Sequence, residues 1–325
     1  MKRTFLTIAM AAAGILGLST PASAQDYPVK GNPISLIVPF APGGASDILA
    51  RLLGQKFSEV WNTPVVVQNR PGGEMIIALQ SVARAEADGY TMGLTTSSFA
   101  LNKVVRKDFP MDPVADLSAI GFIGKSSYVL AVNPELGYKT FDELAKATTD
   151  QNKNFSYASC CFGTYFAAEM LKATTDLEGV HVPYKGSSPA LQAILAKDVQ
   201  YIIDTTTATK PHIASGKLVP LMVTGRDRSQ SLPDVPSLTD AGIPGDFDIG
   251  VWYGLTFPAG TPENIVQTAN AALNEILAMP DVKSRIESLD IEITPNTPQA
   301  MTERVTRDLN SYTNAIKVAK LEFGN

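Results

Sequence analysis

Residues 34–57 constrain the fold more than any other segment of the chain. Residues 34–38 are mostly apolar and partly β-branched, which predicts a buried strand. A turn with Gly43 and Gly44 follows, and the apolar residues then recur at helical spacing up to residue 57. Ser46 or Asp47 is the expected cap of this helix. Strand, glycine turn and helix in this order form the βα unit of an α/β fold.

The turn between this strand and this helix is suited to bind an anion. A helix start leaves backbone N–H groups unpaired and carries the positive end of the helix dipole, and glycine lets a ligand approach the backbone. The Lys-Ser/Thr of a phosphate-binding loop and the third glycine of a dinucleotide fingerprint are missing here, so no nucleotide site is expected. A small carboxylate fits better, although a βα turn that binds nothing is the commoner case.

The same pattern recurs in the next segments. Strands are predicted at residues 64–68 and 90–94, with a helix between them. Successive βα units imply a parallel sheet whose loops gather at one edge, where α/β sheets bind their ligands. The hydroxyl residues at 95–98 are therefore expected to face the same cleft as Gly43 and Gly44.

A second series of strands and polar turns lies between residues 155 and 207, and the C-terminal third reads as helical. Extended segments near residues 126–132 and 250–257 are expected to cross between the two halves. The prediction is a two-lobed α/β protein whose lobes close on a ligand. Domain 1 is expected to comprise residues 25–126 and 253–325, and domain 2 residues 127–252.

Residues 1–24 have the basic start, apolar core and Ala-x-Ala end of a signal peptide, so export and cleavage after Ala24 are expected. Loss of Lys2 and Arg3 changes the formal net charge from −5 to −7. An acidic chain with two histidines is a poor nucleic-acid binder and offers little to a zinc site. Neither a metal nor a cofactor is expected.

Cys160 and Cys161 are the only cysteines. In an oxidising compartment they form either a strained vicinal disulfide or two thiols, and adjacent residues rarely reach disulfide geometry. A secreted hydrolase is the alternative from another functional class. Neither His181 nor His212 lies in a nucleophile-elbow context, however, and no Gly-x-Ser-x-Gly occurs.

Seven motifs in chain order resemble the Bug family, the periplasmic solute receptors of tripartite tricarboxylate transporters. They are Ile-Val-Pro-Phe-Ala-Pro-Gly-Gly-Ala-Ser-Asp (37–47), Asn-Arg-Pro-Gly (69–72), Ala-Asp-Gly-Tyr-Thr (87–91), His-Val-Pro-Tyr-Lys-Gly (181–186), Ser-Gly-Lys-Leu (215–218), Leu-Pro-Asp-Val-Pro (232–236) and Pro-Ala-Gly-Thr-Pro (258–262). The resemblance implies a type II periplasmic-binding-protein fold, no catalysis, and a carboxylate ligand closed between the lobes. It also implies transporter subunits in the membrane as partners, and a monomer is expected. A receptor that presents its ligand to a membrane sensor is the alternative.

Carried over from the family, the ligand site is expected to include one jaw from each lobe. Its residues would be Phe40, Gly43, Gly44, Ala45, Ser46, Asp47, Ser97, Ser98 and Asn102 in the first lobe and Cys161, Thr164, Lys185, Gly186, Ser187 and Asp204 in the second. Three of them have alternatives: Asp47 as a helix cap, Lys185 as a solvated surface lysine, and Asp204 as a cap of its own turn.

The chain departs from the family pattern at two places. Glu74, Met75 and Ile76 stand where the family usually has further glycines and an Asn. Met75 or Ile76 is expected to narrow the cleft, and Glu74 to weaken anion binding at a helix start. Cys161 or Phe162 is expected to line the pocket where glycine would leave room. These changes favour a ligand with an apolar or aromatic body over a tricarboxylate.

Overall fold

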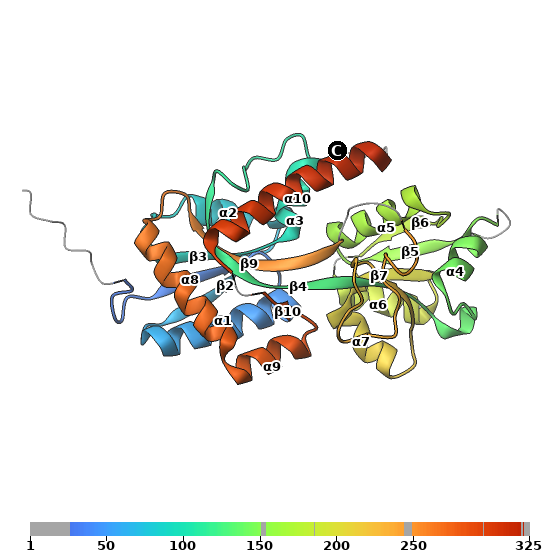
Figure 1. Cartoon of the computed structure of the whole chain (residues 1–325), viewed down its shortest axis with the longest axis horizontal. Helices are drawn as coiled ribbons and strands as arrows, with labels where there is room; N and C mark the ends of the chain where they lie inside the picture. The colour runs from blue at the N-terminus through green and yellow to red at the C-terminus, as the bar shows by residue number, and fades with distance from the viewer. Residues whose placement is uncertain are drawn as a thin grey trace, which may run out of the picture.

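The computed structural model describes residues 27–150, 154–184, 186–243, 249–294, 296–319 and 321. The predicted signal peptide with its cleavage at Ala24, and Lys185, lie outside the described residues. The described chain forms two α/β lobes that are joined by two long strands (Figure 1). The predicted two-lobed α/β class is therefore confirmed, and the strands that begin at residues 65, 34, 91, 250, 117, 201, 156 and 180 follow one another in this order across the sheet.

The first lobe is built on the three βα units that the sequence predicts. The parallel strands are β1 (Ile34–Val38), β2 (Val65–Asn69) and β3 (Thr91–Thr96). The helices that follow them are α1 (Ala45–Trp61), α2 (Ile76–Ala83) and α3 (Ser97–Val105). Ile34, Leu36 and Val38 are fully buried in β1 and pack with Leu53 and Phe57 of α1. The strand and the apolar helix face thus form one core.

Strands β4 (Leu117–Val132) and β9 (Gly250–Pro258) carry the chain between the lobes, as the sequence predicts. The first part of β4 pairs with β9, from Leu117↔Pro258 to Ser127↔Gly250. Its last residues pair with β7 (Tyr201–Thr205) and β8 (Val219–Val223) of the second lobe. Because one strand belongs to both halves of the sheet, residues 125–128 form the hinge segment.

The second lobe repeats the parallel pattern. Strands β5 (Ser156–Ser159) and β6 (Val180–Pro183) run parallel to each other, and β5 also runs parallel to β7. The helices are α4 (Phe141–Thr148), α5 (Phe162–Thr174), α6 (Ser187–Ala196) and α7 (Thr206–Ala214). Helix α4 begins after its N-cap Thr140, which forms a capping box with Glu143.

The C-terminal third is helical, as predicted, and returns to the first lobe. It comprises α8 (Glu263–Ala278), α9 (Pro280–Ser288), the short strand β10 (Glu292–Ile293) and α10 (Pro298–Ala319). Helix α10 runs above β9 toward the second lobe (Figure 1). Asp308 of α10 accepts a hydrogen bond of 2.6 Å from the indole Nε1 of Trp252 in β9, so the helix is anchored on a crossing strand. Within the described ranges, no helix is both long and apolar enough to span a membrane.

Candidate functional site

The turn between β1 and α1 presents an open surface of backbone. Gly43 has a φ of +93°, a left-handed conformation that favours glycine, and Gly44 is the N-cap of α1. A Cβ atom built on either glycine would have no heavy atom of the described residues within 4 Å, apart from its chain neighbours. The N–H groups in the first turn of a helix have no intrahelical acceptor. The turn therefore offers donors and the positive helix end beside open space.

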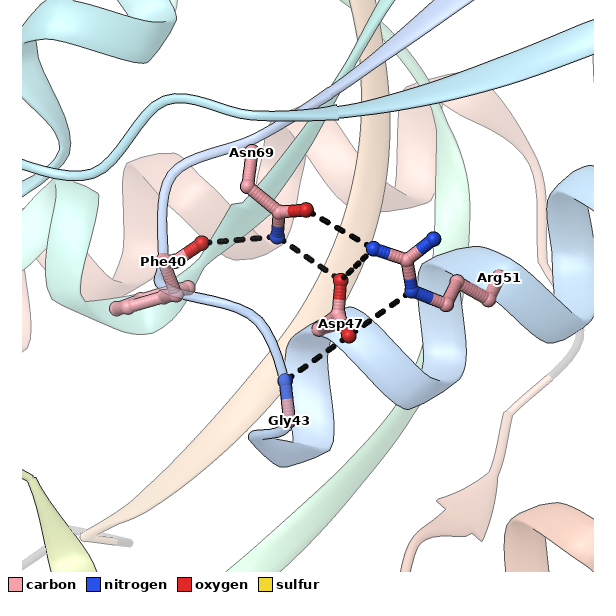
Figure 2. A network of polar contacts seen from close by, with 5 residues as sticks. All are labelled: Phe40, Gly43, Asp47, Arg51 and Asn69. Carbon is pink, nitrogen blue, oxygen red and sulfur yellow. Dashed lines mark hydrogen bonds and ion pairs between the residues drawn. The ribbon is translucent and has the colours of Figure 1, made fainter.

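A polar network holds this turn in place (Figure 2). Asp47 Oδ2 accepts hydrogen bonds of 3.0 Å from the Gly43 N–H and from Arg51 Nε. Asp47 Oδ1 accepts one of 2.9 Å from Asn69 Nδ2, which also donates to the Phe40 carbonyl at 3.0 Å. Burial raises the pKa of Asp47, but the hydrogen bonds from Arg51, Gly43 and Asn69 outweigh it and lower that pKa. The carboxylate thus stays charged and fixes the turn.

The network corrects the predicted start of α1. The helix begins at Ala45, two residues before Asp47, and neither Ser46 nor Asp47 is its cap. Asp47 bonds to the N–H of Gly43, which lies outside the helix, and Ser46 is inside the first helical turn. We therefore assign Asp47 the role of positioning the glycine turn, because its oxygens are occupied by three protein groups.

The turn before α2 has an unusual backbone. Gly72, Gly73, Glu74 and Met75 have consecutive positive φ angles of 123°, 58°, 53° and 79°. Such angles cost energy for residues other than glycine, and strain of this kind concentrates at functional sites. Asn102 lies beneath the turn, fully buried, and its Nδ2 donates to the Glu74 carbonyl at 3.2 Å. Its Oδ1 has no hydrogen-bond partner among the described residues.

Met75 does not narrow the cleft, so this part of the prediction is wrong. Its side chain is 2% exposed and belongs to a core cluster with Ile37 and Phe99. The left-handed backbone turns the side chain inward, which sequence spacing alone cannot show. Ile76 and Phe40 are partly buried and pack against the same cluster. Asn102 and Met75 thus support the turn from below.

Replacing Glu74 by glycine is expected to stabilise the protein by about 0.5–1 kcal/mol, because glycine adopts a left-handed conformation without the steric cost that other residues carry. Glu74 is exposed, and its hydrogen bond to Asn102 uses the carbonyl, which glycine retains. Urea denaturation measures the change. Glu74→Ala is the matched control, because alanine removes the same carboxylate and keeps the steric cost. A gain of equal size in both variants would contradict a backbone origin.

The start of α3 connects the first lobe with the hinge and with the second lobe. Ser97 is 4% exposed, and its Oγ donates to the Gly250 carbonyl of β9 at 3.1 Å. The Ser98 Oγ lies 3.6 Å from the Cβ position of Gly163, at the start of α5 in the second lobe. The two predicted serines therefore differ: Ser97 is bonded to the hinge strand, whereas Ser98 lies where the lobes meet.

The turn between β5 and α5 is organised by Thr164, which is fully buried. Its Oγ1 accepts hydrogen bonds from the N–H groups of Cys160 at 3.1 Å and Cys161 at 3.3 Å, and it donates to the Cys161 carbonyl. Helix α5 begins at Phe162, directly after the two cysteines. Cys160 and Cys161 are free thiols in the structure, and Cys161 is exposed.

The next turns of the second lobe meet this one. The Gly186 N–H donates to the Cys160 carbonyl at 3.1 Å, and the Ser187 Oγ donates to Asp204 Oδ1 at 2.7 Å. Asp204 also accepts from the Thr205 N–H at 2.6 Å. The structure therefore brings five predicted second-lobe residues into one cluster, namely Cys161, Thr164, Gly186, Ser187 and Asp204.

Asp204 is the buried acid of this cluster. It is 0% exposed, and its Oδ2 has no hydrogen-bond partner within the described part of the chain. Burial raises the pKa of Asp204, and the hydrogen bonds from Ser187 and Thr205 offset this effect only in part. An unpaired carboxyl oxygen at the end of a strand is an acceptor for a ligand donor or for a bound water.

The hinge strands β4 and β9 place two tyrosines beside the second-lobe cluster. Tyr128 of β4 lies against Gly163, with its Oη 2.4 Å from the position of an added Cβ. Burial and then the neighbouring thiols of Cys161 and Cys160 raise the pKa of Tyr128. Burial, the same thiols and Asp204 also raise the pKa of Tyr253 in β9. Both tyrosines are thus close to the second-lobe cluster.

The comparison with known proteins identifies this arrangement. The family model described as "Tripartite tricarboxylate transporter family receptor" matches residues 49–321. The chain belongs to this receptor family. It is 33% identical to the protein BugT of Bordetella pertussis over 265 residues, which are 80% of this chain and 80% of BugT. The predicted resemblance to the Bug family is therefore confirmed.

Solved structures of such receptors share the fold. Rpa4515 of R. palustris, solved with adipate, is 29% identical and has a TM-score of 0.83 over 91% of this receptor and 99% of its own chain. MatC of Rhodopseudomonas palustris, solved with bound malate, is 27% identical and has a TM-score of 0.79 over 89% of this receptor and 100% of its own chain. Proteins of this family are solute-binding receptors with a periplasmic location rather than enzymes.

The receptor has a cleft that sequence analysis missed. It has a volume of about 680 Å³, lies beside the hinge and is lined by both lobes. None of the predicted site residues that the structure describes lines it. Its charged lining residues are Lys125, Asp227, Arg228, Lys283, Glu287, Asp290, Glu292 and Arg304. They come from separate segments of the receptor and form no motif, so no sequence signal marks this cleft. Among the described residues, no cluster of acidic, His or Cys side chains could hold a metal ion.

Proposed function

We propose that the receptor is exported, loses its signal peptide after Ala24 and acts as a monomer in the periplasm. It then closes the two predicted domains, residues 25–126 with 253–325 and residues 127–252, on a small dicarboxylate with an apolar body. It delivers this ligand to the membrane subunits of its transporter and performs no catalysis. The first jaw is the turn from Phe40 to Asp47, and the second is the cluster around Asp204.

The observation that carries this proposal is the open glycine turn at the start of α1. Within the described part of the chain, no atom lies within 4 Å of the Cβ position of Gly43 or Gly44, so a ligand reaches the backbone there. Helices α3, α5 and α6 also begin directly after parallel strands. Helix starts of this kind bind carboxylates through N–H groups and the helix dipole. Adipate in Rpa4515 and malate in MatC agree with an acidic ligand.

The second jaw supports a ligand that also donates a hydrogen bond. Asp204 Oδ2 is buried and unpaired among the described residues, so a hydroxyl, a protonated carboxyl or a water carried by the ligand would satisfy it. The partly buried Phe40 and Phe162 suit an apolar chain between the two acid groups. A ligand with two acid groups thus has a place for each end.

Thermal unfolding with a panel of acids tests the proposal. At a concentration of about 100 times its Kd, a ligand that binds only the folded state stabilises the protein by roughly 2.7 kcal/mol. We expect the largest rise in Tm with a dicarboxylate between malate and adipate in length, and a smaller one with a tricarboxylate. The diamide of adipic acid is the matched neutral control. The proposal fails if this diamide gives the largest shift or if no acid gives any.

Two further measurements separate the proposed role from its alternatives. Deletion of the gene is expected to abolish uptake of the dicarboxylate, and intact uptake with a lost transcriptional response would favour signalling to a membrane sensor. Purified protein is expected to leave p-nitrophenyl esters unhydrolysed. Ester turnover that disappears in a His181→Ala variant would support the hydrolase instead.

A further inference from the structure

The adjacent cysteines of the second jaw form a preorganised pair of thiols. Their Sγ atoms are 3.5 Å apart, and the Cys160 thiol donates a hydrogen bond to the Cys161 sulfur. Cys160 is 9% exposed, whereas Cys161 is exposed to solvent. The chain has no other cysteine, so neither thiol has a competing partner within the protein. Cys161 is thus the residue nearer to solvent, and Cys160 is placed to react with its sulfur.

The peptide between the two cysteines also holds the second jaw together. Its carbonyl, from Cys160, accepts the N–H of Gly186, at the start of α6. Its N–H, from Cys161, donates to the Oγ1 of Thr164, the residue that organises the start of α5. Rotation of this single peptide would break both hydrogen bonds. The β5–α5 and β6–α6 turns are therefore connected through the cysteine pair.

The local chemistry favours attack by Cys161. The hydrogen bond from Cys160 and then the backbone of Thr164 lower the pKa of Cys161, although desolvation of its sulfur opposes them, and Cys161 is the N-cap of α5, a position that stabilises a thiolate. The hydrogen bond to Cys161 and burial raise the pKa of Cys160. An exposed nucleophile beside a buried resolving thiol is the arrangement of redox-active cysteine pairs.

A disulfide between adjacent residues would be strained and easily reduced. Adjacent Cα atoms are about 3.8 Å apart across a trans peptide, whereas disulfides usually join Cα atoms at least about 4.4 Å apart. Strained and exposed disulfides have high reduction potentials and are the labile ones. Closing this bond must distort the peptide between Cys160 and Cys161.

We propose that Cys160 and Cys161 are a reversible thiol–disulfide modification site, and that its oxidation weakens ligand binding by disrupting the second jaw. The oxidant is a protein disulfide of the thiol-oxidase class. The Cys161 thiolate attacks one sulfur of that disulfide, which forms a mixed disulfide and releases a thiolate. Cys160 then loses its proton to solvent and attacks the Cys161 sulfur, which releases the second thiolate. Two electrons pass from the cysteine pair to the oxidant, which becomes a dithiol.

The modification is tested without any ligand. The purified mature protein is equilibrated in glutathione buffers from fully reduced to fully oxidised, and thiols and amide exchange are followed by mass spectrometry. We expect a monomer that loses both thiols in the oxidised buffers, with faster exchange of the Cys161 and Gly186 amides, and full reversal by dithiothreitol. Persistence of both thiols, cross-linked dimers alone, or unchanged amide exchange in the disulfide form would overturn the proposal.

The effect on binding rests on the proposed function and is measured with adipate. Loss of two hydrogen bonds in the jaw is expected to weaken adipate binding by about tenfold in the oxidised protein. Cys161→Ser and Cys160→Ser are matched controls, and each is expected to have the same affinity in both buffers. Equal affinity of the oxidised and reduced wild type would overturn the coupling. Absence of adipate binding in both states would count against the proposed ligand, and the amide exchange would still decide the modification.

Discussion

Replacing Gly44 by valine is expected to abolish dicarboxylate binding and to leave the fold intact. Gly44 has φ −82° and ψ 170°, which any residue adopts, and an added Cβ would meet no heavy atom within 4 Å. Valine therefore fits without strain, and its methyl groups fill the space beside the first N–H groups of α1. Hydrogen bonds that involve a charged group contribute about 1.5–3 kcal/mol each, so loss of two lowers the affinity at least ~100-fold.

Two companion variants show whether the loss of binding is caused by the filled space or by a changed backbone conformation. Gly44→Ala adds a single methyl group at the same place and is expected to weaken binding less than valine. Gly43→Ala forces alanine to a φ of +93° and is expected to cost about 1–2 kcal/mol of stability. Calorimetric titration with adipate measures affinity, and thermal unfolding measures stability. Wild-type affinity of Gly44→Val would reject the glycine turn as a jaw.

Much of the fold is predictable because its local and tertiary signals agree. The apolar run of β1 and the apolar face of α1 point to one core, and Ile34, Leu36 and Phe57 are all fully buried in it. Thr140 and Glu143 have the residue types and the three-residue spacing that a capping box requires. Parallel pairing follows from the repeated βα units, since parallel strands need a crossover connection.

The errors occur where a contact from elsewhere in the chain decides the local structure. Asp47 is of a residue type that is common at helix N-caps. Its carboxylate instead binds Asn69 at the end of β2 and Arg51 within α1, and the helix begins two residues earlier. Cys161 is not a residue type expected at an N-cap, yet the buried hydroxyl of Thr164 makes it one. The sequence pattern of the helix start alone cannot predict such hydrogen-bond partners.

The candidate site is predictable in outline but not in the role of each residue. The order of the turns places Gly43, Ser98 and Asp204 at strand ends, and the structure agrees. Met75 points into the core because its backbone is left-handed. Glycine is the residue that usually indicates such a backbone, and the sequence has methionine at this position. The cleft beside the hinge depends on segments that meet only in the folded chain.

Replacing Asp204 by asparagine is expected to weaken adipate binding more than tenfold and to stabilise the ligand-free protein. Asparagine keeps the Oδ1 acceptor for Ser187 and the Thr205 N–H, at 2.7 and 2.6 Å. It replaces the unpaired Oδ2 by a donor, so a ligand group or water that donates there meets another N–H. An unsatisfied buried group costs about 1–3 kcal/mol when it is neutral and more when it is charged, so the unpaired amide of the variant costs less than the unpaired carboxylate.

The gain in stability must depend on pH with a definite sign. Burial raises the pKa of Asp204 in the folded state above its unfolded value of about 4. Between these two pKa values the folded state binds more protons than the unfolded state, so the wild-type free energy of unfolding falls as pH rises. Asparagine does not titrate, and the advantage of Asp204→Asn therefore grows above about pH 4 and levels off above the folded pKa.

Urea denaturation of both proteins across this pH range measures the difference, and Asp47→Asn is the matched control. Hydrogen bonds from Arg51, Gly43 and Asn69 lower the pKa of Asp47 despite its burial, so its carboxylate stabilises the fold above the unfolded pKa. That contribution is lost as pH falls through the lowered pKa, and the deficit of Asp47→Asn must shrink toward acid. Opposite trends in the two variants are required, because one acid is desolvated without a full set of partners and the other is fully bonded. A pH-independent difference for Asp204→Asn would mean that this carboxyl group is not the strained acid of the second jaw.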